Sequence, residues 1–168
     1  MTETRLHVRY LQLTRAPAPI PIRSGPERIA AERLPLDDYL TLYQRVGIPL
    51  RWDQRLQMPR EELNALLQSS RLQIYVLRDG AAQALGFCEL DRTGFPDIEL
   101  KNFGLIPAAQ GRGLGPWLLA SALHQEWQLR PARIWLHTDE WDHPAAIPVY
   151  QRVGFELYLT REEPAAPL

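Results

Sequence analysis

The sequence predicts a single α/β domain of the α+β type, with a mixed, mostly antiparallel central sheet flanked by helices. Three observations support this fold class. The chain has 168 residues, which fits one domain of ordinary size. Apolar and polar residues alternate in early segments that are joined by short turns, which is typical of antiparallel strands. Later in the chain, a strand, a helix and another strand follow one another, which favours a layered α/β arrangement with a mixed sheet.

The first 70 residues predict one strand and two helices. Residues 5–13 alternate as a half-buried strand does. Residues 16–26 hold four prolines and cannot continue a helix or a strand, so an irregular connection is expected there. Apolar residues recur at helical spacing over 35–46, and a second helix is expected over 61–67, where acidic residues fill the first turn.

The remaining residues predict a hairpin, a third strand and an alternation of helices and strands. The expected elements are strands 72–77, 84–90 and 98–106, helix 116–129, strand 133–138, helix 144–152 and strand 154–159. Pro148 falls inside the last helix, so a short or bent helix is expected there.

Charge and composition exclude several classes of function. Nineteen basic and twenty acidic residues give a net charge of −1, which provides no basic surface for nucleic acid or for an anionic membrane. No apolar run approaches the length of a membrane span, and the N-terminus has no apolar leader. The single cysteine, Cys88, favours a reducing compartment. We therefore expect a cytoplasmic protein, and the arginine-rich, proline-rich composition suggests a bacterial genome of high GC content.

A glycine-rich turn carries the strongest chemical signal. Gly111, Gly113 and Gly115 lie between a strand and the helix that starts at Pro116, and Arg112 adds a cation. Free backbone N–H groups and the positive end of the helix dipole make such a turn an anion site, most naturally for phosphate. A dinucleotide fingerprint is excluded because Pro116 occupies the position of its third glycine, and no Lys-Ser/Thr pair completes a P-loop.

Two motifs together resemble the GNAT superfamily of acetyl-CoA-dependent N-acetyltransferases. Gln110, Gly113 and Gly115 match the family's Q/R-x-x-G-x-G/A loop, which binds the pyrophosphate of coenzyme A. Ala146 and Tyr150 match N-x-x-A-x-x-x-Y, and Gly-Phe follows at 154–155, as in the family. The resemblance covers about residues 70–160 and implies splayed central strands.

The resemblance also implies a cofactor site for acetyl-CoA as co-substrate. In that site a backbone N–H near Leu105 faces the acetyl carbonyl if the strand bulges there, and Gly104 would make such a distortion sterically cheap. His143 stands where the family usually has asparagine. The implied cofactor-binding residues are Leu105, Ile106, Pro107, Gln110, Gly111, Arg112, Gly113, Leu114, Gly115 and His143.

Four side chains are the candidates for catalysis and acceptor binding. Glu99, on the strand before the loop, is expected to be the general base, working through water, and Tyr150 the general acid. Glu89 is the reserve base near the acceptor, and Trp52 is expected to wall the acceptor pocket. The competing interpretations are that Glu99 faces solvent on an alternating strand and that Tyr150 is a core aromatic. The His/Asp cluster at 137–143 lacks metal-ligand spacing, so no metal is expected.

The sequence therefore predicts one acetyltransferase domain over 1–168, with an acceptor-side part at 1–70 and a cofactor-binding core at 71–160. The expected acceptor is an amine on a small molecule or a peptide, and acidic residues around the expected cleft suggest a cationic one. A homodimer is compatible with the family. Two alternatives stay open: a non-catalytic acyl-CoA-binding sensor of the same fold, and a phosphate- or nucleotide-binding module.

Overall fold

One seven-stranded sheet, in the order β2-β3-β4-β5-β6-β1-β7, organises this computed structural model, which describes residues 3–165. All neighbouring strands are antiparallel except β5 and β6, which are parallel. The strands are β1 (Arg5–Leu13), β2 (Arg28–Glu32), β3 (Leu72–Arg78), β4 (Ala84–Asp91), β5 (Asp97–Leu105), β6 (Arg133–Thr138) and β7 (Glu156–Pro164). The predicted fold class, a mixed and mostly antiparallel sheet, is confirmed.

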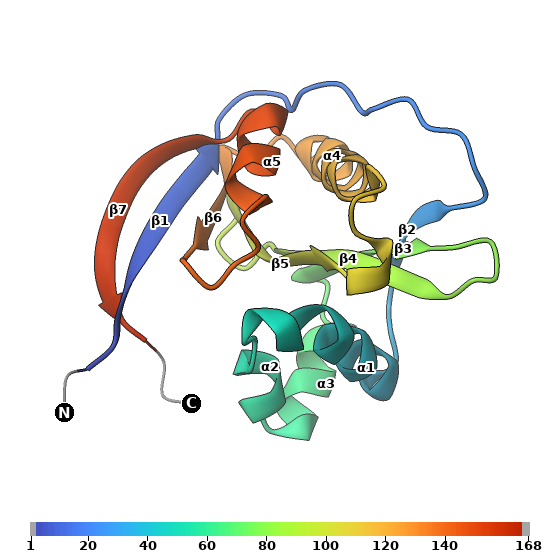
Figure 1. The fold of residues 1–168 in the computed structure, drawn as a ribbon, viewed down its shortest axis with the longest axis horizontal. Coiled ribbons are helices and arrows are strands. Elements are labelled where there is room, and N and C mark those ends of the chain that lie inside the picture. The colour runs from blue at the N-terminus through green and yellow to red at the C-terminus, as the bar shows by residue number, and fades with distance from the viewer. Residues whose placement is uncertain (1–2, 166–168) are drawn as a thin grey trace.

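Helices cover both faces of the sheet (Figure 1). The helices are α1 (Leu36–Gly47), α2 (Gln54–Gln57), α3 (Arg60–Gln68), α4 (Leu114–Trp127) and α5 (Ala146–Val153), with one-turn 3-10 helices at Ile48–Leu50 and Pro107–Ala109. Helices α1, α2 and α3 lie on one face, and α4 and α5 on the other. No helix among residues 3–165 is long and apolar enough to cross a membrane.

The apolar spacing in the sequence explains which helix faces are buried. On α1, Tyr39, Leu42, Tyr43 and Val46 recur at helical spacing and are all buried. Tyr39 packs edge-on against Phe87 of β4, with ring centroids 6.0 Å apart. On the opposite face, α4 contributes a second set of fully buried leucines. Burial of each such side chain contributes about 1.5–3 kcal/mol, so both layers are anchored on the central strands.

Strand β1 lies between β6 and β7, far from the elements that follow it in the chain. Arg5 pairs with Pro164 at the far end of β7, and Leu13 pairs with Ile134 of β6. The curved β1–β7 pair extends beyond the helices (Figure 1). The N-terminal strand therefore belongs to the C-terminal half of the sheet.

The central strands separate as the family resemblance implied. Strands β5 and β6 pair only where Asp97–Glu99 faces Arg133–Trp135, and beyond these residues the two strands diverge. The bulge that accompanies this lies at Lys101, because Glu89 and Leu90 of β4 face Asn102 and Leu100. We expected the distortion at Gly104, so the sequence interpretation was three residues out.

Gly104 has a different steric role. A Cβ atom at Gly104 would lie 2.5 Å from Val46 Cγ1, and the next nearest side chain is that of Trp52. A side chain there would push α1 and the Trp52 loop away from β5. The glycine is therefore required for close packing of α1 on the strand.

Pro148 does not interrupt α5, and of the expected alternatives, a short or a bent helix, the structure shows a short one. The helix begins at Ala146, so Pro148 lies in its first turn, where a backbone N–H has no intrahelical acceptor in any case. Val149 already donates to the carbonyl of Ala145 at 3.2 Å. The helix is short, with eight residues, but proline removes none of its hydrogen bonds.

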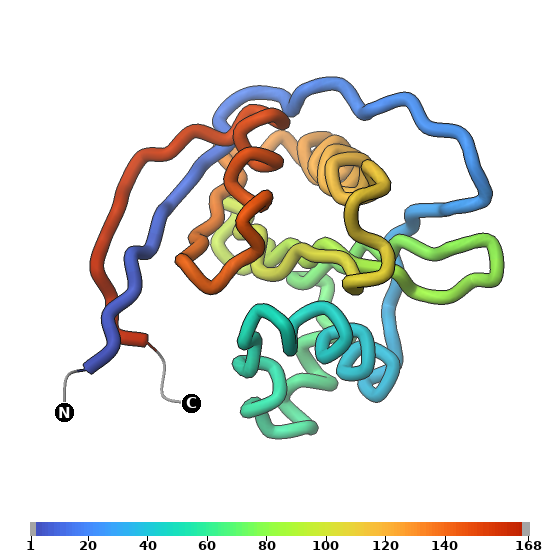
Figure 2. Tube along the Cα trace, in the orientation of Figure 1, coloured from blue at the N-terminus to red at the C-terminus, as the bar shows by residue number. Residues whose placement is uncertain are grey.

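The proline-rich connection, residues 16–27, is called here the crossing segment because it runs along the outside of α4 (Figure 2). The Ala18 N–H donates to the carbonyl of Val153 at 2.9 Å, and the Ala18 carbonyl lies 2.8 Å from His124 Nε2. The segment leads into β2, a short edge strand with mostly exposed side chains. The sequence did not indicate β2, because its exposed residues have no alternation.

Candidate active site

One cavity of about 610 Å³ joins the glycine-rich loop, the gap between the separated strands and the loop after α1. It is called here the main cavity. Its walls come from β5, β6, α4, α5, the Leu50–Gln54 connection and the end of β7. The separation of β5 from β6 thus creates an opening that reaches from one side of the sheet to the other.

The glycine-rich loop presents backbone N–H groups to this cavity. Gly111 and Gly113 have φ angles of 76° and 73°, which strongly favour glycine. Gly113 is the residue before the first turn of α4, and no side chain caps the helix there. The free N–H groups of that turn and the helix dipole make the loop suited to a diphosphate. A Cβ at Gly111 would contact nothing within 4 Å, so the space in front of the loop is open.

The structure places most of the expected cofactor residues around the main cavity. Those that line it are Leu105, Gln110, Gly111, Gly113, Leu114, Gly115 and His143. Three others do not line it: Ile106 is buried in the core, Pro107 starts the 3-10 turn, and the Arg112 side chain is bonded to Glu27 at 2.8 Å. The Arg112 side chain is therefore engaged outside the main cavity in this arrangement.

Tyr150 lies on α5 with its ring between Phe103 of β5 and Phe155. The residue is 6% exposed and lines the main cavity. Burial raises the pKa of the Tyr150 hydroxyl well above its ordinary value, and the nearby Asp142 carboxylate adds to this. The hydroxyl therefore remains protonated at neutral pH, as a proton donor must.

Glu99 is the last residue of β5 that pairs with β6, and these two strands separate beyond it. Its carboxylate does not itself line the main cavity. It lies 3.1 Å from Lys101 Nζ and 3.9 Å from His137 Nε2. His137, on β6, does line the cavity, so Glu99 can reach the cavity through this imidazole. No local pattern pairs the two residues, because they come from different strands.

Glu89 is fully buried on β4 and does not line the main cavity. Its oxygens accept hydrogen bonds from Tyr39 at 2.5 Å, Arg55 at 2.5 Å and Asn102 at 2.9 Å. Burial alone would lower the pKa of Arg55, but the attraction of the Glu89 carboxylate outweighs this effect, so the pKa of Arg55 is raised. Burial and the same carboxylate raise the pKa of Tyr39. Glu89 therefore holds α1 and α2 against the sheet, and this geometry does not favour its role as reserve base.

Trp52 and Asp142 form the wall opposite the glycine-rich loop. Trp52 lines the main cavity, as expected for the acceptor pocket. Asp142 is not among the expected catalytic or binding residues, although it lines the same cavity. It accepts hydrogen bonds from the Thr138 hydroxyl and from the Asp139 N–H. Burial raises the pKa of the Asp142 carboxyl, while its hydrogen bond with the Thr138 hydroxyl opposes the shift. The signal that could have identified it is its short distance in sequence from Tyr150.

The acceptor end of the main cavity carries more acidic than basic side chains. Arg51 is held over the Trp141 ring at 5.0 Å, and Lys101 is paired with Glu99. The acidic residues that line the cavity are Asp53, Asp139, Asp142 and Glu163. This distribution favours a positively charged ligand at that end.

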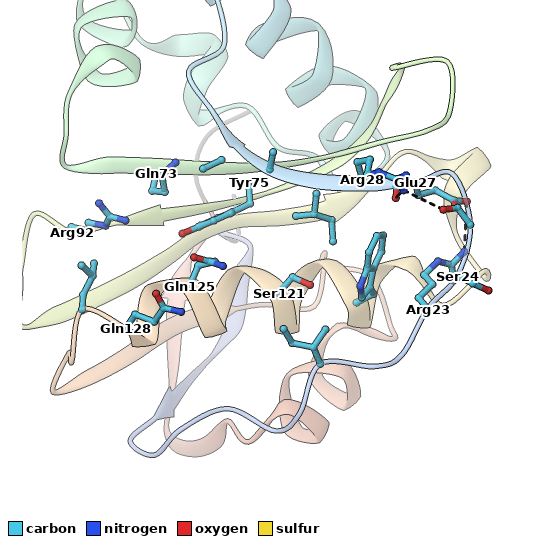
Figure 3. A pocket seen from close by; sticks show the side chains of 17 residues that line it. Arg23, Ser24, Glu27, Arg28, Gln73, Tyr75, Arg92, Ser121, Gln125 and Gln128 are labelled. Atoms are coloured by element: carbon cyan, nitrogen blue, oxygen red, sulfur yellow. Dashed lines mark hydrogen bonds and ion pairs between the residues drawn. The ribbon is translucent and has the colours of Figure 1, made fainter.

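A second cavity, of about 830 Å³, lies between α4, β3 and the crossing segment (Figure 3). None of the expected site residues lines it. Glutamines line one end, where Arg92 is paired with the buried Glu126. Arg23, Glu27 and Arg28 gather at the other end (Figure 3). Among residues 3–165, no three His, Cys, Asp or Glu side chains are placed to hold a metal ion.

Comparison with known proteins identifies similar chains. Residues 36–155 match the family model described as "Acetyltransferase (GNAT) family". A mycothiol acetyltransferase of Mycobacteroides abscessus is 37% identical over 83 residues, which cover 47% of this chain and 27% of that protein.

Solved structures share the fold. A Drosophila protein superimposes with a TM-score of 0.71 at 14% identity, covering 96% of this chain and 51% of the other. A GCN5-related N-acetyltransferase from Sphaerobacter thermophilus gives a TM-score of 0.65 at 18% identity, covering 96% and 52%. The chain therefore spans about half the length of these structures and about a quarter of the curated relative.

Proposed function

Because the chain belongs to the GNAT family of acetyltransferases, we propose that it transfers the acetyl group of acetyl-CoA to a primary amine. The observation that supports this most directly is the main cavity. It is continuous from the Gln110–Gly115 loop, past Tyr150, to the acidic residues beyond Trp52. A long thioester bound at the loop and an amine entering from the other end would meet in the gap between β5 and β6.

The loop and the separated strands suit acetyl-CoA. The N–H groups of the first turn of α4 would bind the diphosphate, with Gly111 and Gly113 leaving room for it. Because β5 no longer pairs with β6 beyond Glu99, its backbone near Leu105 is free on the β6 side to bind the rest of the cofactor. Acetyl-CoA supplies the activated acetyl carbon, and the residues of the chain position it and move protons.

The proposed chemistry is direct attack accompanied by proton transfers. Glu99, acting through His137 or through water, takes the first proton from the acceptor ammonium. The neutral nitrogen then bonds to the acetyl carbon, and the carbon–sulfur bond breaks. Tyr150 donates its proton to the departing sulfur, which needs a hydroxyl that is still protonated at the reaction pH. The amide nitrogen then loses its second proton, which restores the Tyr150 hydroxyl through water. The products are the acetamide and free CoA.

The acceptor we propose is a cationic primary amine on a small molecule or a peptide. Asp53, Asp139, Asp142 and Glu163 at the acceptor end would attract it. The buried thiol of Cys88 is compatible with action in a reducing cytoplasm.

Release of free CoA from acetyl-CoA tests the proposal. Polyamines, aminoglycosides and peptides with a free lysine would be compared at equal concentration, with a thiol reagent as readout. The only cysteine, Cys88, is fully buried, so the folded enzyme contributes little background. We expect amine-dependent release that exceeds the rate without acceptor. Calorimetry that detects no acetyl-CoA binding to the folded protein would contradict the proposal, and tight binding without turnover would instead support a sensor.

A further inference from the structure

Three guanidinium groups lie around Glu27 at the charged end of the second cavity. Glu27 has a side chain that is 6% exposed, and its Oε1 lies 2.8 Å from Arg112 Nη2 and 3.6 Å from Arg23 Nη2. The third guanidinium is that of Arg28, whose Nη1 donates to the carbonyl oxygens of Glu27 and Gly25 at 2.8 and 3.2 Å. Figure 3 shows Arg23, Glu27 and Arg28 together at this end.

The charges of this cluster do not balance. Three arginines and one glutamate leave a formal charge of +2. Arg28 is bonded only to backbone carbonyls in the described part of the chain. Arg23 Nε is the one buried side-chain nitrogen or oxygen among residues 3–165 that has no hydrogen-bond partner. Buried donors are nearly always bonded in folded proteins, so the unpartnered N–H points to an acceptor that binds there.

The cluster is attached to the loop that would bind the cofactor diphosphate. Arg23 Nη1 donates to the carbonyl of Arg112 at 2.8 Å. The same atom lies 3.6 Å from the position that a Cβ would take on Gly113, which directly precedes α4. The positive end of the α4 dipole adds to the local field. An anion here would therefore lie next to the diphosphate, on the side of the loop that faces the crossing segment.

We propose that Arg23, Arg28 and Arg112 form a phosphomonoester subsite that takes the ribose 3′-phosphate of acetyl-CoA. The proposal depends on the function proposed above, in which the neighbouring loop binds the diphosphate. A phosphomonoester carries a charge of about −1.5 to −2 at pH 7, which matches the unbalanced +2. Guanidinium groups bind such oxygens in pairs of parallel hydrogen bonds. Arg112 and Arg28 are exposed enough to admit the group.

This assignment gives the crossing segment a role in the same reaction. The segment borders the second cavity along part of its length. Arg23 and Glu27 tie it to the glycine-rich loop through Arg112. A bound 3′-phosphate would add bonds to Arg23 and Arg28 from outside the chain. The N-terminal segment would then contribute directly to cofactor affinity.

Calorimetric titration with CoA and with 3′-dephospho-CoA tests the proposal. The wild type is expected to bind CoA about 10- to 100-fold more tightly, as charged hydrogen bonds of ordinary strength would give. Arg28→Gln and Arg23→Gln should each reduce this ratio about fivefold or more, and leave the affinity for 3′-dephospho-CoA nearly unchanged. Arg28→Gln is the safer variant, because Arg28 bonds only backbone carbonyls. The matched control is Arg15→Gln, an exposed arginine just before the crossing segment and outside the cluster, which should keep the wild-type ratio.

Each other outcome has a defined meaning. Equal affinity of the wild type for the two cofactors would overturn the subsite and leave the proposed function intact. Binding of neither cofactor by the folded protein would contradict the proposed function itself. Inorganic phosphate is the remaining probe. If it still binds in an Arg28-dependent way when CoA is saturating, the cluster serves a separate anion and its assignment to the cofactor is wrong.

Discussion

Arg55 of α2 and Glu89 of β4 form a buried ion pair, with Nη2 2.5 Å from Oε2 and side chains that are 11% and 0% exposed. Tyr39 and Asn102 complete the hydrogen bonding of the carboxylate. The pair connects the four-residue helix α2, which has no buried residue of its own, to the central strand. Since α2 follows directly after Trp52 and Asp53, the pair also fixes one wall of the main cavity.

Removing one partner of this pair is expected to be costly. Glu89→Ala leaves the Arg55 charge buried without compensation, a change that typically costs about 3–5 kcal/mol. Urea unfolding at pH 7 would measure the loss. The matched control is Asp37→Ala, which breaks the exposed Arg60–Asp37 pair and should change stability by less than about 1 kcal/mol. Equal effects of the two substitutions would contradict the structural role of Glu89.

Tyr150→Phe separates catalysis from packing. The phenyl ring keeps the contacts with Phe103 and Phe155, so stability and acetyl-CoA affinity should change little. Loss of the proton donor should lower kcat by about 10²-fold or more. Steady-state kinetics together with calorimetry of acetyl-CoA would measure both. Equal losses of affinity and turnover would assign Tyr150 to cofactor binding.

Glu99 and His137 are predicted to act as a unit. Glu99→Gln and His137→Asn should each lower kcat/KM at neutral pH, and the double variant should be little worse than either one, because residues that work together are not additive. The control is His124→Asn, which alters a histidine bonded to the crossing segment and should leave kcat/KM nearly unchanged. Independent, multiplicative losses would show that Glu99 does not act through His137.

Asp142 should make stability depend on pH. Burial raises the pKa of its carboxyl in the folded state above the ordinary value of 3.8, so the folded chain binds this proton more tightly than the unfolded chain. The stability contribution is therefore complete below pH 3.8 and is lost as pH rises through the raised pKa. Asp142→Asn should gain stability relative to the wild type across this window. Urea unfolding at several pH values between 4 and 7 measures it, and a difference that does not vary with pH would refute the assignment.

Local patterns predicted most of the fold. Residues 5–13, the hairpin strands and the helix after the glycine-rich loop were placed within a few residues, because periodicity, glycine and proline act over short distances. The same logic placed Pro148 inside a helix but could not locate the helix start. The start depends on the turn at residues 142–145, where His143 Nδ1 accepts from the Ala145 N–H. Edge strand β2 had no local signal, since its pairing with β3 is the main reason that it is a strand.

The site was predictable only as far as its motifs extend. The loop and Tyr150 were found because their spacing is fixed along the chain. The Glu99–His137 pair, the burial of Glu89 and the position of Asp142 beside Trp52 depend on contacts between distant segments. Residue type alone does not determine such contacts. The role of the crossing segment was missed for the same reason, because Glu27 and Arg112 are 85 positions apart.

The position of β1 between β6 and β7 has a consequence for how the molecule folds. This strand is synthesised before both of its neighbours, and Arg5 can pair with Pro164 only after β7 has been made. Until then its backbone groups and the apolar side chains of Leu11 and Leu13 have no partners in the sheet. Closing so long a loop slows folding. Strand β1 is therefore exposed to mispairing or to a chaperone during synthesis.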